Sequence, residues 1–525
     1  MSASRRIATA GLIVTGAYLA SRLLGWVRLA VISTTFGAGS ELDAFFAAFR
    51  IPDLVFQLVA AGALSSALIP VLAGLHAHGE DARAWRVAST VANIVLVALA
   101  LLAGLFAVGA PLLVPLVTPG FDAATTERTV ELTRLMLAGP LLLALSAVAT
   151  SVLNARGRFA AAAAAPVAYN LAIIGAALLL APALGVEALA VGVVVGSFLT
   201  LLVQILPLAR AGFRYRPAVD AADPAAREVL VLMAPRAVGL GASQVTLIAL
   251  TTLASGLPVG SVTALNVAFT LLQLPIGVIG VPLGIVVFPS LARELATGAV
   301  AAYAALLLRA LRLVVVAMLP IAAIGAVLRT ELVTLLFGYG RFDAAAIELT
   351  AGTFLPFLAG LPAHALIAIL ARAFYADKET RIPALAACVS VVVNVGFAVV
   401  TVGSLGLAAL ALAIAIGAWV ETAVLVALLR RRIPGLELGG LVGVALRAGI
   451  AAAGGAALAF GTVSQLAPAF GAPATVEADR LGLLAVTAVA GGAGLVGFAA
   501  LARALRIPEL ATIVGAMADV LRRRS

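Results

Sequence analysis

The sequence has few of the residues on which soluble enzymes and extracellular domains depend. Its 525 residues include one cysteine, Cys388, and three histidines, and only 11% of them are charged. A single cysteine excludes an intrachain disulfide, and the apolar run around Cys388 favours a packed, unreactive thiol. The phosphate-binding pattern GxxxxGKS/T, the zinc pattern HExxH and paired-cysteine metal motifs are all missing. We therefore expect neither an enzyme nor a bound cofactor.

Apolar residues take the place of these features. Hydrophobic residues make up 63% of the chain, and its mean hydropathy is +1.17. Apolar runs of about 20 residues recur along the whole sequence, and each can cross the hydrocarbon core of a bilayer as a helix. The first run continues into an arginine-bearing stretch without a clear processing site, unlike a cleaved signal peptide. The sequence predicts an all-α polytopic membrane protein.

About fourteen transmembrane helices are predicted from the lengths of these runs. The predicted spans cover residues 7–34, 42–73, 87–117, 130–153, 164–183, 187–209, 228–254, 262–290, 303–327, 346–374, 383–402, 406–429, 441–463 and 483–504.

Arginines alternate from one side of the predicted membrane to the other. Odd-to-even connections are acidic or neutral, whereas even-to-odd connections are basic, as at Arg156 and Arg158 and at Arg210, Arg214 and Arg216. The positive-inside rule then places both termini in the cytoplasm, although Arg329, Arg341 and Arg480 fall on the outer side. The formal charge of +10 is explained by this topology, so no nucleic-acid partner is expected.

The two halves of the chain resemble each other weakly. Residues 43–70 end in GALSSALIPVL, and residues 262–289 end in GVPLGIVVFPSL after the same number of positions. Parallel repeats of this kind favour a substrate site between two lobes and alternating access. We expect an N-lobe at 1–214 (spans one to six), a C-lobe at 215–432 (spans seven to twelve), a helix pair at 433–505 and an amphipathic cytoplasmic tail at 506–525.

Charges within the second predicted span follow one face of the helix. Asp43, Arg50 and Gln57 are spaced by seven, which stacks them, and Asp53 lies beside them. A charge at the bilayer centre costs about 2.5–3.5 kcal/mol even on lenient scales, so such residues usually face a polar cavity. We interpret this face as one wall of a charged cavity.

The first predicted span carries Arg22 and Arg28, which lie six positions apart. On a regular helix these positions differ by roughly 120°, so the two side chains should not point the same way. Each charge also has a structural explanation. Asp43 can cap a helix, Arg28 can reach an interface, and Arg50 can pair with Asp53 without binding a ligand.

Three polar residues are candidates for gating or ion coupling. Glu421 and Asn394 lie in predicted spans of the second half, and Gln57 lies in the second span. Glu421 can bind a coupling cation or a proton, or pair with an arginine. His76 and His78 form an H-x-H pattern, for which a solvated loop is the favoured explanation, and no metal site is predicted.

Several long motifs resemble one family. SRLLGWVRLAVISTTFGAG, LDAFFAAFRIPDL, LNARGRFAAAAAAPVAYN and LFGYGRFDAAAIELTAGTFLPFLAGLPAHALIAILARAFYADKETRIP are similar to segments of the MurJ (MviN) lipid II flippases, in the same order. The resemblance implies the fourteen-helix fold of the multidrug/oligosaccharidyl-lipid/polysaccharide exporter superfamily. It also implies a cationic cavity for the diphosphate-sugar head of lipid II and a groove for the polyprenyl tail formed by the last two helices.

The resemblance also implies roles for individual residues. Arg22 and Arg28 match functionally important arginines, Asp43 matches an important aspartate, and Arg50 stands where a lysine is common. Two family arginines are missing. The position expected for one of them is occupied by Phe56 or Gln57. The position expected for the other is occupied by Thr270, and Gln273 nearby replaces an acidic residue.

The expected function is translocation of undecaprenyl-diphosphate-linked peptidoglycan precursor, lipid II, from the inner to the outer leaflet of the bacterial cytoplasmic membrane. Arg22, Arg28, Asp43, Arg50 and Asp53 are the expected substrate-binding residues. The alternatives are export of another polyprenyl-linked glycan and a non-transporting scaffold of cell-wall synthesis. Membrane lipids and cell-wall synthesis proteins are candidate partners, and the driving force stays open.

Overall fold

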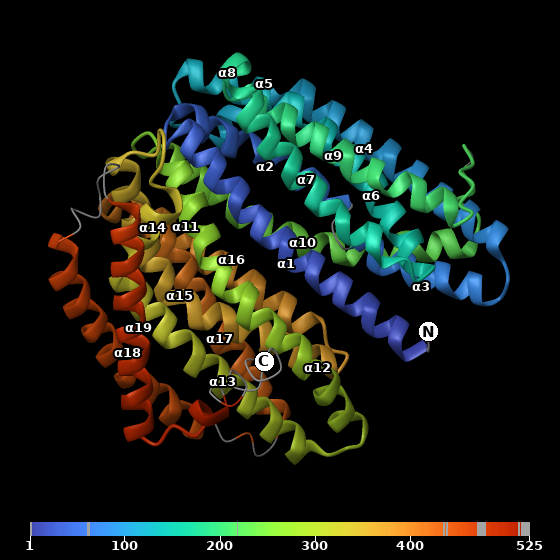
Figure 1. Cartoon of the computed structure of the whole chain (residues 1–525). Coiled ribbons are helices and arrows are strands. Elements are labelled where there is room, and N and C mark those ends of the chain that lie inside the picture. The colour runs from blue at the N-terminus through green and yellow to red at the C-terminus, as the bar shows by residue number, and fades with distance from the viewer. Residues whose placement is uncertain are drawn as a thin grey trace. The chain divides into compact units, whose positions relative to one another are not determined.

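The computed structural model describes residues 3–59, 63–217, 219–433, 436, 439–469, 479–512 and 515, and over these residues it contains helices and connecting turns but no strand (Figure 1). The chain divides into two compact units, Met1–Thr263 and Ala264–Ser525. The four-part division into 1–214, 215–432, 433–505 and 506–525 stays a prediction. Residues 513–514 and 516–525 of the predicted tail lie outside the described residues.

Most residues of the first unit lie in helices. They are α1 (Ala3–Phe36), α2 (Ser40–Val59), α3 (Ala63–Ala77), α4 (Asp81–Val117), α5 (Ala123–Met136), α6 (Ala138–Ala155), α7 (Phe159–Leu179), α8 (Ala181–Leu184), α9 (Glu187–Arg210), α10 (Pro224–Ser255) and the start of α11 (Ser261–Pro275).

The second unit continues α11 and adds a further series of helices. They are the π-helix η1 (Ile276–Gly280), α12 (Val281–Ala296), α13 (Val300–Val327), α14 (Arg329–Phe337), α15 (Ala344–Ala376), α16 (Arg381–Leu405), α17 (Leu407–Arg432), α18 (Gly439–Leu466), the 3₁₀ helix η2 (Ala467–Ala469) and α19 (Arg480–Ala504).

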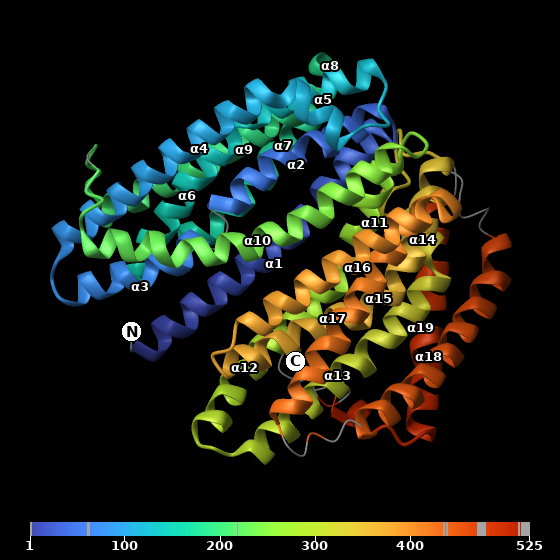
Figure 2. The same ribbon diagram turned by 180° about the vertical axis from the view of Figure 1, so that it is seen from behind.

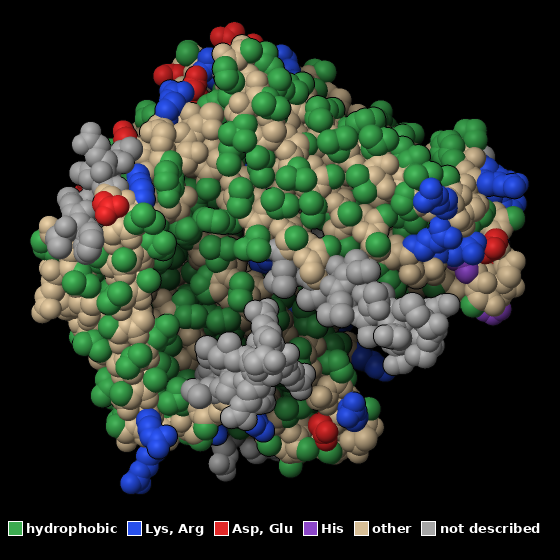
Figure 3. All heavy atoms as spheres, viewed as in Figure 1, with side chains coloured by type: hydrophobic (Ala, Val, Ile, Leu, Met, Phe, Trp, Pro, Cys, Tyr) green, Lys and Arg blue, Asp and Glu red, His purple; other side chains and the backbone are tan. Residues whose placement is uncertain are grey.

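The all-α polytopic fold is confirmed, because eleven segments among the described residues are long and apolar enough to cross a membrane. One face of α4 is an example of such an apolar surface. Leu101, Leu105, Val108, Leu112 and Leu116 recur at helical spacing and are each 68–81% exposed. Exposed side chains of this kind match an apolar solvent, and hydrophobic side chains also cover much of the surface in Figure 3. The count of fourteen spans stays a prediction.

Two predicted spans contain a break in the regular helix. The span predicted at 130–153 starts earlier and is divided between α5 and α6 at Leu137. The span predicted at 262–290 contains η1 directly after Pro275, whereas the span predicted at 42–73 comprises α2 and α3, with residues 60–62 outside the described part of the chain. Proline lacks the N–H that continues the helical ladder, and π-helical turns are a usual local response. The short helix α14 was not predicted.

Two hydrophobic clusters hold the first unit together. One joins α3, α4, α6 and α10 to the later part of α2, at Ile51 and Val55. The other joins α1, α5, α7 and α9 to the earlier part of α2, at Leu42 and Phe45. Therefore α2 lies between them, and its charged residues are placed within the packed unit. Figure 2 shows α10 passing along α2 and α3, with which it is in contact.

Close packing of α7 on α9 depends on two glycines of α9. A Cβ at Gly192 would lie 2.7 Å from the Cβ of Ala176, and one at Gly196 would lie 3.0 Å from the carbonyl oxygen of Tyr169. Small residues allow helix backbones to approach in this way. The Gly192–Gly196 spacing noted in the sequence therefore has a packing role, which fixes the position of Tyr169.

In the second unit, α15 is largely buried and packs against α13 and α17, while α18 and α19 pair with each other (Figure 1). Two further hydrophobic clusters join α13 to this pair. The last two long helices thus contact the body of the second unit through α13 and α14.

Candidate functional site

The charged face of α2 lies against α10 and the start of α11. Because α2 and α10 are antiparallel, residues later in α2 contact residues earlier in α10. Asp43 contacts Gly260 and Thr263, and Arg50 contacts Thr251. Asp43 and Arg50 thus share a face of α2, as their seven-residue spacing indicates, and the interpretation of that face as a cavity wall stays a prediction.

Asp43 is 3% exposed and is fully occupied as a hydrogen-bond acceptor. One carboxylate oxygen accepts from the backbone N–H of Gly260 at 2.7 Å. The other accepts from the backbone N–H of Thr263 at 2.7 Å and from its hydroxyl at 2.6 Å. Asp43 therefore caps the first turn of α11, and its charge is balanced by the donors at that helix end.

Arg50 is 8% exposed, and its Nε donates to the hydroxyl of Thr251 at 2.9 Å. Asp53, one turn farther along α2, is close enough to interact with the Arg50 charge and also accepts hydrogen bonds from the side chains of Gln57 and Gln244. A buried charge is tolerated only when it is paired and hydrogen-bonded. Arg50 and Asp53 meet this condition together.

The arginines of α1 have different surroundings. Arg22 is exposed, whereas Arg28 is half-buried, and its guanidinium carbon lies 5.7 Å from the centre of the Tyr169 ring on α7. A guanidinium over an aromatic face is stabilised by the ring quadrupole and is restrained in its orientation.

Asn170 ties α7 to α1 beside this pair. Its side-chain amide donates to the carbonyl oxygen of Pro166 at 2.9 Å and to that of Ser21 at 3.4 Å. Ser21 immediately precedes Arg22, so this contact fixes the backbone from which the Arg22 side chain projects.

Glu421 and Asn394 lie together at the contact between α16 and α17. Glu421 is hydrogen-bonded to Ser390, one turn before Asn394. A Cβ at Gly417 would lie 2.9 Å from the Cβ of Asn394, which shows how closely the helices approach. Asn394 is 6% exposed, and its Oδ1 has no hydrogen-bond partner among the described residues. A carboxylate, a hydroxyl and an amide oxygen therefore lie on adjacent turns.

The two histidines of the H-x-H pattern have separate environments. His76 is at the end of α3, with its Nδ1 2.5 Å from Asp81 and its ring 4.7 Å from that of Trp85. His78 donates from Nδ1 to the carbonyl oxygen of Gly74 at 2.8 Å. His76 is therefore packed rather than solvated. Within the described part of the chain, no three His, Cys, Asp or Glu side chains are grouped as metal ligands.

Sequence reasoning missed the residues that position these charges, namely Tyr169, Gln244, Thr251 and Thr263. Gln244 and Thr251 are spaced by seven, so a polar stripe on α10 was visible in the sequence. A polar stripe alone does not reveal which helix it contacts, and that information comes from the fold.

Comparison with known proteins relates most of the chain to one family. The family model described as lipid II flippase MurJ matches residues 32–474. The lipid II flippase MurJ of Burkholderia cenocepacia is 34% identical over 430 residues, covering 80% of this chain and 83% of that protein. A probable lipid II flippase MurJ of Rhizobium tropici is 32% identical over 442 residues, covering 82% of each chain.

The chain belongs to the MurJ lipid II flippase family. The family assignment made from the motifs is thereby confirmed. Solved structures agree with the fold: a MurJ in an inward closed conformation has a TM-score of 0.77 at 20% identity and covers 94% of this chain and 99% of that one. An inward-facing multidrug resistance transporter of the MATE family has a TM-score of 0.63 at 18% identity, covering 79% and 95%.

Two positions where this MurJ relative lacks an expected arginine are filled by neutral residues with local partners. Thr270 donates its hydroxyl to the carbonyl oxygen of Asn266, one turn earlier in α11, at 2.8 Å. Gln57 donates to Asp53. Neither position supplies a positive charge, so the cationic residues within 16–36 of α1 and in α2 are Arg22, Arg28 and Arg50.

Proposed function

We propose that this chain is a flippase that carries lipid II across the membrane by alternating access. The observation that carries this proposal is its membership of the MurJ family over most of its length, with a relative described as a lipid II flippase at 34% identity. The charged residues of α1 and α2 then act on the head group.

Arg22 and Arg28 are the proposed diphosphate-binding residues. A guanidinium group stays charged at any physiological pH and offers paired donors that match phosphate oxygens. Arg22 is exposed and can reach a ligand directly, whereas Arg28 is restrained against Tyr169. Restraint of this kind lowers the entropy lost when the diphosphate binds.

Asp43, Arg50 and Asp53 organise and gate the site in this proposal. Asp43 fastens the start of α11 to α2, and Arg50 and Asp53 fasten α10 to α2. Helix contacts of this kind must loosen if α10 and α11 move relative to α2 during transport. Gln57, as a donor to Asp53, belongs to the same group.

An apolar cavity in the second unit is the proposed site for part of the polyprenyl tail. It has a volume of about 330 Å³ and is bordered by α13, α15, α17 and α18, with Leu311, Leu366, Trp419 and Leu446 among its lining residues. The indole N–H of Trp419 donates to the carbonyl oxygen of Ala359, so the polar edge of the ring is satisfied. The ring face is left for hydrocarbon.

Glu421, Ser390 and Asn394 form the proposed ion-coupling site. Their oxygen atoms suit a proton or a small monovalent cation, and the unpartnered Oδ1 of Asn394 is an unused acceptor. Replacing Glu421 with Gln should abolish the dependence of transport on an imposed ion gradient. Unchanged dependence would exclude this role.

The membrane of residence in this proposal is the bacterial cytoplasmic membrane, with both termini in the cytoplasm. The alternating basic connections support this orientation. Cell-wall synthesis proteins are the proposed partners, since they make and use lipid II.

Complementation tests the function. The chain is expressed in a bacterium depleted of its own lipid II flippase, beside the variants Arg22→Ala/Arg28→Ala and, as a control for charge, Arg430→Ala/Arg431→Ala. We expect rescue by the unmodified chain and the control, but not by the first variant at equal membrane levels. Failure of the unmodified chain would favour another polyprenyl-linked glycan or a scaffold role, and rescue by both variants would refute the assigned site.

A further inference from the structure

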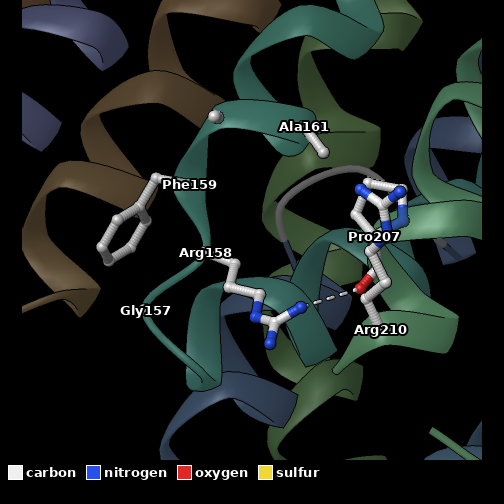
Figure 4. Close-up of a pocket in the computed structure, with 7 residues that line it drawn as sticks. Gly157, Arg158, Phe159, Ala161, Pro207 and Arg210 are labelled. Atoms are coloured by element: carbon white, nitrogen blue, oxygen red, sulfur yellow. Dashed lines mark hydrogen bonds between the residues drawn. The ribbon is translucent and has the colours of Figure 1, made fainter. Parts of the chain in front are cut away.

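A cavity opens where the turn between α6 and α7 meets the last turn of α9. Its volume is about 370 Å³, several times the ~30 Å³ that one water molecule occupies in the liquid. Arg158 borders it from the turn, Phe159 from the start of α7, and Pro207 and Arg210 from α9 (Figure 4). None of the residues proposed to act on lipid II lines this cavity, so it is a separate feature of the first unit.

Two guanidinium groups from different elements share the cavity. The Arg158 side chain extends toward α9, where its Nη1 donates to the carbonyl oxygen of Pro207 at 3.3 Å (Figure 4). No carboxylate in the described part of the chain forms an ion pair with Arg158 or Arg210. Two arginines that border one cavity, neither of them ion-paired among the described residues, favour an anion in it.

The first turn of α7 adds donors to the same cavity. Arg158 is its N-cap residue and makes no side-chain capping bond, while Ala160 and Ala161 line the cavity. The first N–H groups of a helix have no partner within the helix and carry a partial positive charge. This feature would be insufficient alone, but here it points to the same ligand charge as the two arginines.

Apolar side chains lead from the cavity along α9. Leu202, Ile205 and Leu206 are 45%, 48% and 56% exposed, and they lie within the two turns before Pro207 and Arg210. The whole of α9 is long and apolar enough to span a membrane. In a bilayer, these side chains contact acyl chains while the end of α9 reaches the head-group region.

We propose that the Arg158–Arg210 cavity binds the phosphate of an anionic phospholipid, whose acyl chains lie along Leu202, Ile205 and Leu206. Basic pockets between membrane helices are known to suit anionic head groups. A zwitterionic lipid brings a positive charge toward two guanidinium groups, which is unfavourable. Free phosphate matches the charge but leaves the apolar surface of α9 uncovered, so a lipid is the occupant that satisfies both features.

Native mass spectrometry of the purified full chain in detergent tests this proposal. Phosphatidylglycerol is titrated in, with phosphatidylcholine of the same acyl chains and inorganic phosphate as separate arms. We expect retention of phosphatidylglycerol in preference to both. The variant Arg158→Gln/Arg210→Gln should bind it on the order of tenfold more weakly, since each basic residue near a membrane surface contributes attraction.

The matched control is Arg214→Gln/Arg216→Gln, which removes the same charge from the loop after α9 without altering the cavity. If the control weakens phosphatidylglycerol binding as much as Arg158→Gln/Arg210→Gln does, the effect comes from net charge alone and the proposed site is wrong. Equal retention of phosphatidylcholine, or full binding of inorganic phosphate alone, would overturn the lipid assignment. If the double variant does not fold, Arg210→Gln alone should still show a smaller loss, because no described hydrogen bond depends on that side chain.

The readout is lipid retention, not transport. A chain that fails to flip lipid II can therefore still confirm or refute this site, and the two proposals fail independently.

Discussion

The carboxylate of Asp43 accepts hydrogen bonds from both the backbone N–H and the hydroxyl of Thr263, at 2.7 and 2.6 Å. These residues are separated by 220 positions in sequence, and each is almost fully buried. Asp43 follows the start of its own helix, yet it caps the start of another one. Its position near a helix start suggested a capping role in the sequence, but the helix that receives the cap is α11.

Replacing Asp43 should release the start of α11. In Asp43→Ala, the N–H groups of Gly260 and Thr263 lose their acceptor in a buried position. The loss of a helix cap typically costs about 0.5–2 kcal/mol, and burial of unsatisfied donors adds to it. We expect a lower midpoint of thermal unfolding for the purified protein in detergent.

Two variants separate capping from general damage. Thr263→Val removes only the hydroxyl donor, so it should cost less than Asp43→Ala. Glu41→Gln, in the same first turn of α2, removes a half-buried carboxylate that pairs with Arg128 and should change the midpoint little. The capping role would be wrong if Asp43→Ala proved no less stable than Glu41→Gln.

The Arg50–Asp53 pair should show strong coupling. Asp53→Asn leaves the buried Arg50 guanidinium without its opposite charge, and Arg50→Gln leaves the half-buried Asp53 carboxylate without its own. Removing one member of a buried pair commonly costs about 3–5 kcal/mol, whereas replacing both costs less. We expect the double variant to unfold at a higher temperature than either single variant, and additive losses would exclude the pairing.

The ring of Tyr169 should matter more than its hydroxyl. Tyr169→Phe keeps the aromatic face 5.7 Å from the Arg28 guanidinium, whereas Tyr169→Leu removes it. A cation–π contact is worth about 0.5–2 kcal/mol, which corresponds to roughly 2- to 30-fold in affinity. Lipid II binding to reconstituted protein should therefore fall in Tyr169→Leu but change little in Tyr169→Phe. An equal loss in both variants would assign the effect to the hydroxyl.

The sequence was sufficient for the fold class, because long apolar runs can satisfy their backbone groups in a membrane only as helices or closed barrels. It also predicted the polar face of α2, since Asp43, Arg50 and Gln57 follow the helical period. Family motifs supplied the architecture that hydropathy alone could not.

The partners of that face could not be predicted from periodicity. A helical period shows which residues share a face but not which distant helix covers it, and α10 lies about 200 positions away. The helix breaks were missed for a related reason. Hydropathy changes little at Leu137 or Pro275, although the backbone does.

Asp223 gives a pH dependence that can be tested outside the membrane-spanning segments. Arg83 donates to both of its carboxylate oxygens, at 3.0 and 3.1 Å, and the Ala225 N–H donates to one of them at 2.8 Å. The Arg83 guanidinium, followed by the backbone N–H groups at the start of α10, holds the pKa of Asp223 below its ordinary value.

Because the folded-state pKa is lowered, the stabilising contribution of Asp223 is present above the unfolded-state pKa of about 4 and is lost as the pH falls through the folded-state value. We expect Asp223→Asn to lower the thermal midpoint at pH 7 and to have a progressively smaller effect below about pH 4. The control is Asp220→Asn in the same connection. If Asp223→Asn lowers the thermal midpoint equally at pH 7 and at pH 3, the stabilisation does not come from the ionised carboxylate. The contact with Arg83 would then stabilise the fold independently of the charge of Asp223.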